Sequence, residues 1–144
     1  MAMTRLPTNR SGGRANLHQG AVGAGVDLRT GRTNFAVVRT TPVDEHPDTG
    51  VRVVDYPLPH FQDALRTSLR ATDQTGLGYV GADVVVDQER GPILLELNAR
   101  PGLAIQLANR KGLLPRLENF RNANLEGLDL DERIEFGCRI AEAS

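Results

Sequence analysis

The sequence predicts an α+β domain in which helices pack on one face of an antiparallel sheet. Short β-branched runs separated by turns occur at residues 22–39 and again at 79–99, a pattern typical of two β-hairpins. The pattern changes after Pro59, where apolar residues between Phe61 and Ala71 recur at helical spacing. With 144 residues the chain is long enough for one domain and too short for most two-domain enzymes.

The remaining elements follow in order along the chain. Residues 1–13 are polar and contain proline and glycine, so we expect a ragged or flexible N-terminus there. A short helix is expected to begin at Pro101, because proline is favoured at the first helical position. Two further helices are predicted at residues 113–124 and 131–143. We therefore expect a main domain at residues 14–120 and a helical extension at 121–144.

Composition excludes several classes of protein. The 17 basic and 18 acidic residues leave a net charge of −1, which gives no electrostatic argument for nucleic acid or an anionic membrane as partner. A single cysteine, Cys138, excludes an internal disulfide framework. The first residues lack the apolar core of a signal peptide, and no apolar run approaches a membrane span, so we expect a cytoplasmic protein. Lys111 is the only lysine.

The segment from Gly81 to Arg100 carries the most chemical information. A turn at residues 88–91 would place Asp83 directly opposite Glu96 on the partner strand. Because side chains alternate between faces, Asn98 and Arg100 should share the face of Glu96. The opposite face would be apolar, with Ala82, Val84, Val86, Ile93, Leu95 and Leu97.

Two opposed carboxylates repel each other, so something should compensate them. A cation is one candidate, and a set of oxygen ligands favours Mg²⁺ or Mn²⁺ over zinc. The alternative is a solvated face on which Asp83 and Glu96 pair with arginines. A helix beginning at Pro101 would also direct its positive N-terminal end toward this face, where an anion could bind.

A second polar cluster lies near the N-terminus. Arg14, Asn16 and His18 occupy alternate positions and would share one face of an extended segment, suited to phosphate or carboxylate recognition. The alternative is that these three residues simply form the polar face of an edge strand. The glycines of residues 20–25 are not in the order of a dinucleotide-binding motif and indicate a crowded strand or close approach of a ligand.

These residues resemble a known family. Gly81-Ala82-Asp83 with the segment GPILLELNARPGL at 91–103 is similar to the C-terminal catalytic segment of ATP-grasp ligases. RANLHQG at 14–20 resembles the corresponding segment of the glutamate-ligase branch, including α-L-glutamate ligase-like and sugar-transfer-associated ATP-grasp proteins. Residues 14–120 would then form the C-terminal lobe of the ATP-grasp fold.

The resemblance implies roles for individual residues. It places Mg²⁺ (or Mn²⁺) on Asp83, Glu96 and Asn98. It implies contact with ATP or an acyl-phosphate at Arg14, Asn16, Glu96 and Asn98, and catalytic roles for Arg14 and Arg100, with Arg100 near the substrate carboxylate or the transferred phosphate.

The implied activity is ATP-dependent carboxylate–amine ligation, in which an acyl-phosphate of a small-molecule or peptide carboxylate reacts with an amine donor such as glutamate. We expect a second lobe to supply phosphate-binding lysines, a glycine-rich loop and the adenine pocket, or the chain to form a homo-oligomer. A non-catalytic remnant or partner-binding module is the alternative. A metal-dependent hydrolase is a third possibility, although no histidine accompanies the cluster as a general base.

Overall fold

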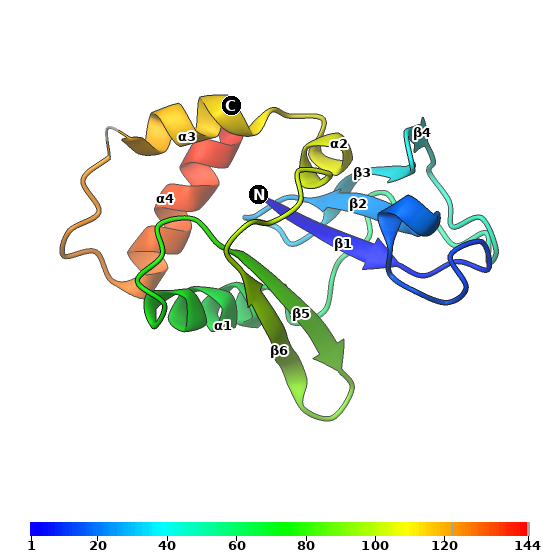
Figure 1. The fold of residues 1–144 in the computed structure, drawn as a ribbon, viewed down its shortest axis with the longest axis horizontal. Coiled ribbons are helices and arrows are strands. Elements are labelled where there is room, and N and C mark those ends of the chain that lie inside the picture. The colour runs from blue at the N-terminus through cyan, green and yellow to red at the C-terminus, as the bar shows by residue number, and fades with distance from the viewer. Residues whose placement is uncertain (122, 144) are drawn as a thin grey trace.

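The computed structural model describes residues 1–121 and 123–143 and has an α+β architecture, as predicted. Its elements are β1 (Ala2–Leu6), the 3₁₀ helix η1 (Leu17–Gln19), β2 (Val22–Val26), β3 (Thr33–Val38), β4 (Thr41–Pro42), α1 (Phe61–Asp73), β5 (Gly81–Asp87), β6 (Gly91–Asn98), α2 (Ile105–Asn109), α3 (Leu113–Arg121) and α4 (Leu130–Glu142). Figure 1 shows the strands β1–β4 on one side, helices α1, α3 and α4 on the other, and the β5–β6 hairpin projecting between them.

The first sheet is antiparallel with the strand order β1-β2-β3-β4. Its β2–β3 hairpin is the one predicted from the sequence. The prediction of a loop over residues 1–13 is wrong for Ala2–Leu6. These residues form β1, which pairs with β2 along its whole length. Leu6 also packs against the core cluster of Val22, Ala24, Ala36 and Val53. Backbone pairing and this contact hold a segment whose composition alone suggests a loop.

The glycines of β2 confirm the crowded-strand interpretation. All five residues of β2 are buried. A Cβ atom at Gly23 would lie 2.8 Å from a methyl carbon of Leu17, and one at Gly25 would collide with the carbonyl oxygen of Ala108. The missing side chains thus let η1 and α2 approach one face of the sheet closely.

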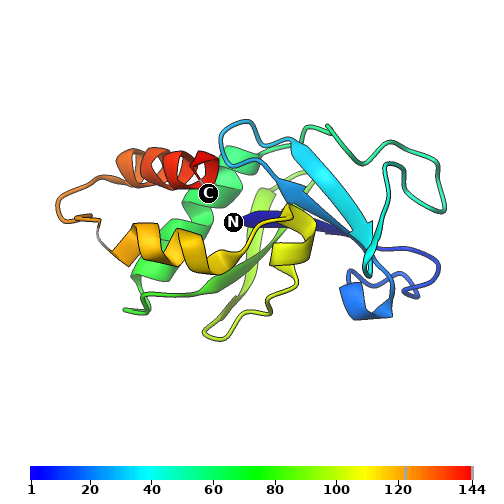
Figure 2. The same ribbon diagram turned by 90° about the horizontal axis from the view of Figure 1, so that it is seen from above.

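The second sheet is the β5–β6 hairpin, so the single predicted sheet is divided into two. Helix α1 packs against both strands of the hairpin and against α4. Two ion pairs join α1 to α4, between Arg66 and Asp131 at 2.6 Å and between Asp73 and Arg133 at 2.8 Å. Figure 2 shows from a second side that α1, α3 and α4 gather beside the four-stranded sheet, whereas α2 packs against one of its faces.

Helix α2 begins at Ile105, so the predicted start at Pro101 is wrong. Pro101 instead packs on the backbone of Gly81, where a Cβ atom would lie 2.6 Å from the proline ring. The later helices α3 and α4 are confirmed, and Asp129 and Glu132 form a capping box at the start of α4. Residues 122 and 144, which belong to the predicted helix 113–124 and the expected C-terminal extension, lie outside the described residues.

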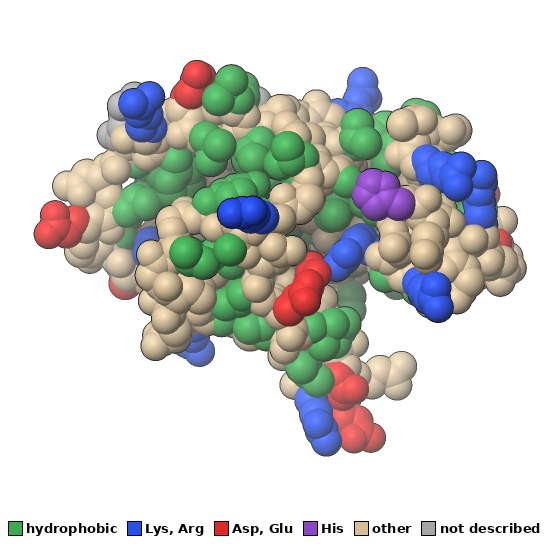
Figure 3. All heavy atoms as spheres, in the orientation of Figure 1, with side chains coloured by type: hydrophobic (Ala, Val, Ile, Leu, Met, Phe, Trp, Pro, Cys, Tyr) green, Lys and Arg blue, Asp and Glu red, His purple; other side chains and the backbone are tan. Residues whose placement is uncertain are grey.

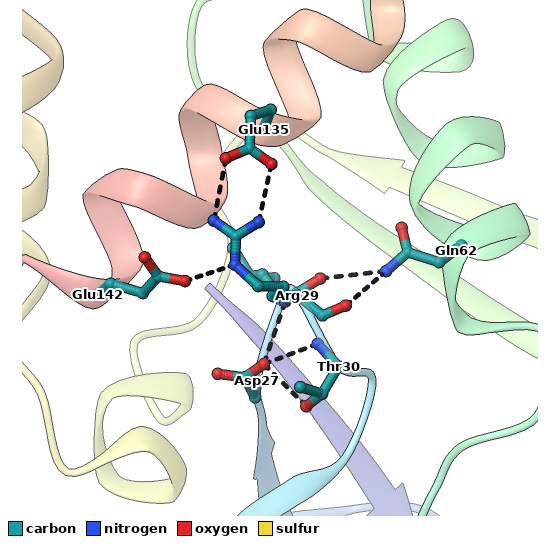
Figure 4. A network of polar contacts seen from close by, with 7 residues as sticks. Asp27, Arg29, Thr30, Gln62, Glu135 and Glu142 are labelled. Carbon is teal, nitrogen blue, oxygen red and sulfur yellow. Dashed lines mark hydrogen bonds and ion pairs between the residues drawn. The ribbon is translucent and has the colours of Figure 1, made fainter.

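Arg29 ties the β2–β3 turn to α4, as Figure 4 shows. Its guanidinium donates to both carboxylate oxygens of Glu135, at 2.8 and 3.0 Å, and to Glu142 at 2.6 Å. These bonds lower the pKa of Glu135 from its ordinary value. Gln62 of α1 donates to the carbonyl oxygens of Leu28 and Arg29. One turn therefore links the sheet to two helices.

In the part of the chain that the structure describes, no helix combines the length and the apolar character needed to cross a membrane.

Candidate functional site

The β5–β6 hairpin places Asp83 directly opposite Glu96, as predicted, and Gly81 opposite Asn98. The three polar side chains therefore start from one face of the hairpin, because alternate residues of a strand share a face. Glu96 and Asn98 are exposed and Asp83 is half-buried. The juxtaposition that the resemblance assigns to metal binding is thus present in the backbone pairing.

The predicted register is wrong by one residue near the turn. Asp87 pairs with Gly91 and Val84 with Leu94, and a β-bulge between Asp83 and Val84 restores the expected pairing at Glu96. The bulge makes Leu95 the extra residue of β6, and the Leu95 side chain is 62 % exposed. Leu95 consequently does not belong to the apolar face predicted for it. A bulge bends its strand and redirects nearby side chains, and here it lies next to the carboxylate pair.

Arg5 of β1 provides the positive charge nearest to Asp83. Its guanidinium lies 2.9 Å from the carboxylate, and both side chains are about 40 % exposed. Sequence reasoning missed Arg5 because residues 1–13 were expected to be a loop; the alternation of Ala2, Thr4 and Leu6 with Arg5 was the available signal. The arginine-paired alternative is therefore realised at Asp83, and the described residues offer no ion pair to Glu96.

Asn98 and Arg100 are joined through the backbone. The side-chain oxygen of Asn98 accepts a hydrogen bond from the backbone N–H of Arg100 at 2.8 Å. The Arg100 side chain is exposed. The expected helix N-terminus near this face is not present, because α2 begins at Ile105 and has only five residues.

The segment from Arg14 to His18 is not a single extended face, which corrects the sequence prediction. The side-chain oxygen of Asn16 accepts from the backbone N–H of His18 at 3.0 Å and caps η1. Gly20 ends this short helix in the left-handed conformation. Asn16 thus has a structural role, while Arg14 is exposed.

The segment at residues 14–18 and the β5–β6 hairpin are linked indirectly, through the first sheet. Leu17, between Asn16 and His18, covers Gly23 of β2. Gly23 is the strand partner of Arg5, which binds Asp83. In the described residues no hydrogen bond or ion pair joins Arg14 or Asn16 to the hairpin carboxylates, and Arg5 lies between the two segments. Figure 3 shows acidic side chains of the hairpin region beside a basic side chain toward the sheet, on the face turned to the viewer.

The donor atoms of this face suit magnesium. Two carboxylates and one carboxamide supply oxygen only, and Mg²⁺ commonly uses one or two protein carboxylates with water and substrate phosphate as its other ligands. Within residues 1–121 and 123–143 no group of three His, Cys, Asp or Glu side chains could enclose a metal. The oxygen donors of Asp83, Glu96 and Asn98 are therefore of the kind that Mg²⁺ prefers, and they do not fit an all-protein cage.

Comparison with protein families matches residues 1–122 to the family described as sugar-transfer associated ATP-grasp. The chain belongs to this family. Membership agrees with the resemblance of residues 14–20 and 81–103 and indicates ATP-dependent, ligase-type chemistry. No curated protein and no solved structure matches the chain. The ATP-grasp fold generally uses ATP with Mg²⁺, and the oxygen donors of the hairpin face are compatible with that pair.

Proposed function

We propose that this sugar-transfer associated ATP-grasp chain is the phosphate- and metal-binding half of a carboxylate–amine ligase that acts in the cytoplasm. The observation that carries the proposal is the direct opposition of Asp83 and Glu96, with Asn98 on the same face. These three residues would hold Mg²⁺. When bound, the ion would neutralise negative charge on the ATP phosphates.

The arginines of the chain carry the remaining roles in this proposal. A carboxylate is a poor electrophile, so ATP first converts it to an acyl-phosphate, and an amine then displaces phosphate to form an amide. Arg14 would bind nucleotide phosphate or the acyl-phosphate, supported by Asn16, and Arg100 would orient the substrate carboxylate. Phosphoryl transfer needs positioning and charge neutralisation more than covalent help, which guanidinium groups supply.

The other parts of the proposed ligase site would lie outside the hairpin and the segment at residues 14–18. The only lysine, Lys111, donates to the carbonyl oxygen of Ala141 at 3.2 Å and is not part of the hairpin face. We infer that phosphate-binding lysines and the adenine pocket belong to a second lobe or to a partner subunit. The substrates would be a small-molecule or peptide carboxylate and an amine such as glutamate.

Calorimetric titration of the chain with ADP and ATP, with and without Mg²⁺, tests the proposal. We expect Mg²⁺-dependent binding that Glu96→Gln abolishes and Glu89→Gln preserves. Both variants remove one carboxylate from the same hairpin, but Glu89 lies in the turn, away from Asp83. Equal Mg²⁺-dependent binding by Glu96→Gln would overturn the assignment of this face.

A non-catalytic partner-binding module is the second candidate. Two observations favour it: Arg5 already neutralises Asp83, and α3 exposes Leu114, Leu117 and Phe120 by 66 %, 44 % and 43 %. Exposed apolar residues at this spacing on one helix are typical of an interaction surface. A folded chain that binds neither nucleotide nor Mg²⁺ in the titration would favour this candidate.

A further inference from the structure

A hollow of about 410 Å³ lies between β3 and α2, on the glycine-bearing face of the first sheet. Figure 1 shows α2 beside β3. The hollow is lined by Phe35, Val37, Thr40, Gln106, Leu107, Arg110, Lys111 and Gly112. Its volume is within the range of about 300–1,000 Å³ that is typical of small-molecule sites. None of the lining residues belongs to the hairpin face described above.

The walls of the hollow are apolar. Val37 is buried, Phe35 is half-buried, and Leu107, in the middle of α2, is 52 % exposed. Covering such a surface with an apolar group is favourable, because water is released from both surfaces.

The charge of the hollow has a single sign. Arg110 and Lys111 line it and no acidic residue does, although the Lys111 ammonium donates to the carbonyl oxygen of Ala141. The guanidinium of Arg110 lies 5.0 Å above the centre of the Phe35 ring. Among the described residues its side chain forms no hydrogen bond or ion pair, so its N–H donors are available for a carboxylate or phosphate.

Arg110 occupies a backbone position that favours glycine. It ends α2 with φ 51° and ψ 30°, in the left-handed region. Glycine is the usual residue at such a position because it has no Cβ atom. Arginine adopts this backbone conformation at a conformational cost, and its guanidinium lies over Phe35.

The loop that carries Arg110 is held in place by α2. The backbone N–H groups of Arg110 and Lys111 donate to the carbonyl oxygens of Leu107 and Gln106, both at 3.2 Å. The side-chain oxygen of Gln106 accepts from the backbone N–H of Leu113 at 2.8 Å. The hollow is therefore preformed, which reduces the ordering cost of binding.

We propose that this hollow is a binding site for a small anion that carries an apolar ring. The ring would cover Val37 and Leu107, and the anionic group, a carboxylate or a phosphate, would accept hydrogen bonds from Arg110. The proposal does not depend on the ligase activity, since the hollow and the hairpin face share no residue.

Titration of the full chain with phenylacetate and with phenyl phosphate, followed by NMR shifts of the lining residues, tests the proposal. We expect saturable shifts at these residues, and the tighter of the two ligands identifies the anionic group. Acetate, which lacks the ring, and phenylacetamide, which lacks the charge, should each bind at least about tenfold more weakly. Equal binding by phenylacetamide, or no saturable shift with either anion, would overturn the proposal.

The Arg110→Gly variant distinguishes an effect on ligand binding from an effect on folding stability. Glycine relieves the left-handed backbone, so we expect an unchanged or higher unfolding midpoint together with at least about tenfold weaker binding of the ring anion. Arg39→Gly is the matched control, because Arg39 is also a non-glycine residue with positive φ, 58°, and does not line the hollow. Binding by Arg110→Gly that equals that of Arg39→Gly contradicts the site.

Discussion

The guanidinium of Arg5, in β1, lies 2.9 Å from the carboxylate of Asp83, in β5. This ion pair joins the four-stranded sheet to the hairpin that carries the candidate magnesium ligands. It also places a positive charge against the carboxylate that a metal ion would need as a ligand. A divalent cation that binds Asp83 must therefore displace Arg5 or share the carboxylate with it.

Replacing Arg5 by methionine should strengthen binding of a divalent cation to the hairpin. An exposed ion pair is worth about 0.2–1 kcal/mol, so removal of this competitor should tighten Mn²⁺ binding by up to about fivefold. Water proton relaxation during a Mn²⁺ titration measures this affinity. Arg90→Met is the control, because it removes an equal charge from the hairpin turn without touching Asp83. Mn²⁺ affinity that is unchanged or weaker in Arg5→Met would show that Arg5 does not compete with the cation.

The sequence predicted the hairpin and the pairing of Asp83 with Glu96, but the register read from the turn is wrong by one residue, and only the bulge brings Glu96 opposite Asp83. It did not indicate the bulge, which shifts the pairing by one residue between Leu95 and the turn. A bulge depends on how the strand fits its surroundings, and those belong to distant segments. Arg5 was missed for a similar reason, since its strand exists only through pairing with β2.

Gly25→Ala should destabilise the chain by about 1–3 kcal/mol, the usual cost of overpacking. The added methyl group would meet the backbone carbonyl of Ala108, which cannot move without displacing α2. Urea unfolding measures the loss. Gly23→Ala, on the same strand and face, should cost less, because its methyl group would meet the end of the flexible Leu17 side chain at 2.8 Å. Equal losses in the two variants would mean that the approach of α2 does not require glycine at position 25.

The start of α2 shows another limit of sequence reasoning. Proline at position 101 is compatible with a helix start, but Pro101 packs on Gly81 and the helix forms four residues later. Local preference was overridden by a contact between residues twenty positions apart. The longer helices α1 and α4, of 13 residues each, were predictable because apolar side chains recur along them at helical spacing.

Arg29→Gln should loosen the attachment of α4 to the sheet. The variant loses the charged hydrogen bonds to Glu135 and Glu142 and leaves two carboxylates close together without their cation. We expect a lower urea midpoint and faster amide exchange in α4, with a smaller effect on midpoint than Gly25→Ala because all three side chains are exposed. Arg121→Gln, in α3, is the control and should leave both measurements unchanged. Amide exchange in α4 that equals the control would show that Arg29 does not hold the helix.

Stability should fall on acidification, and part of the fall should depend on Arg133. The hydrogen bond from Arg133 lowers the pKa of Asp73, so the folded state holds this proton less tightly than the unfolded chain. The stabilisation is therefore complete above the ordinary Asp pKa of about 4 and is lost as the pH falls through the lower value of the folded state. In Arg133→Met the Asp73 pKa returns toward its ordinary value, so the variant should lose less stability than the parent between about pH 5 and pH 2. Urea unfolding at pH values across this range measures both curves. Parallel curves for the parent and the variant would show that the ion pair between α1 and α4 makes no contribution to the acid sensitivity of the fold.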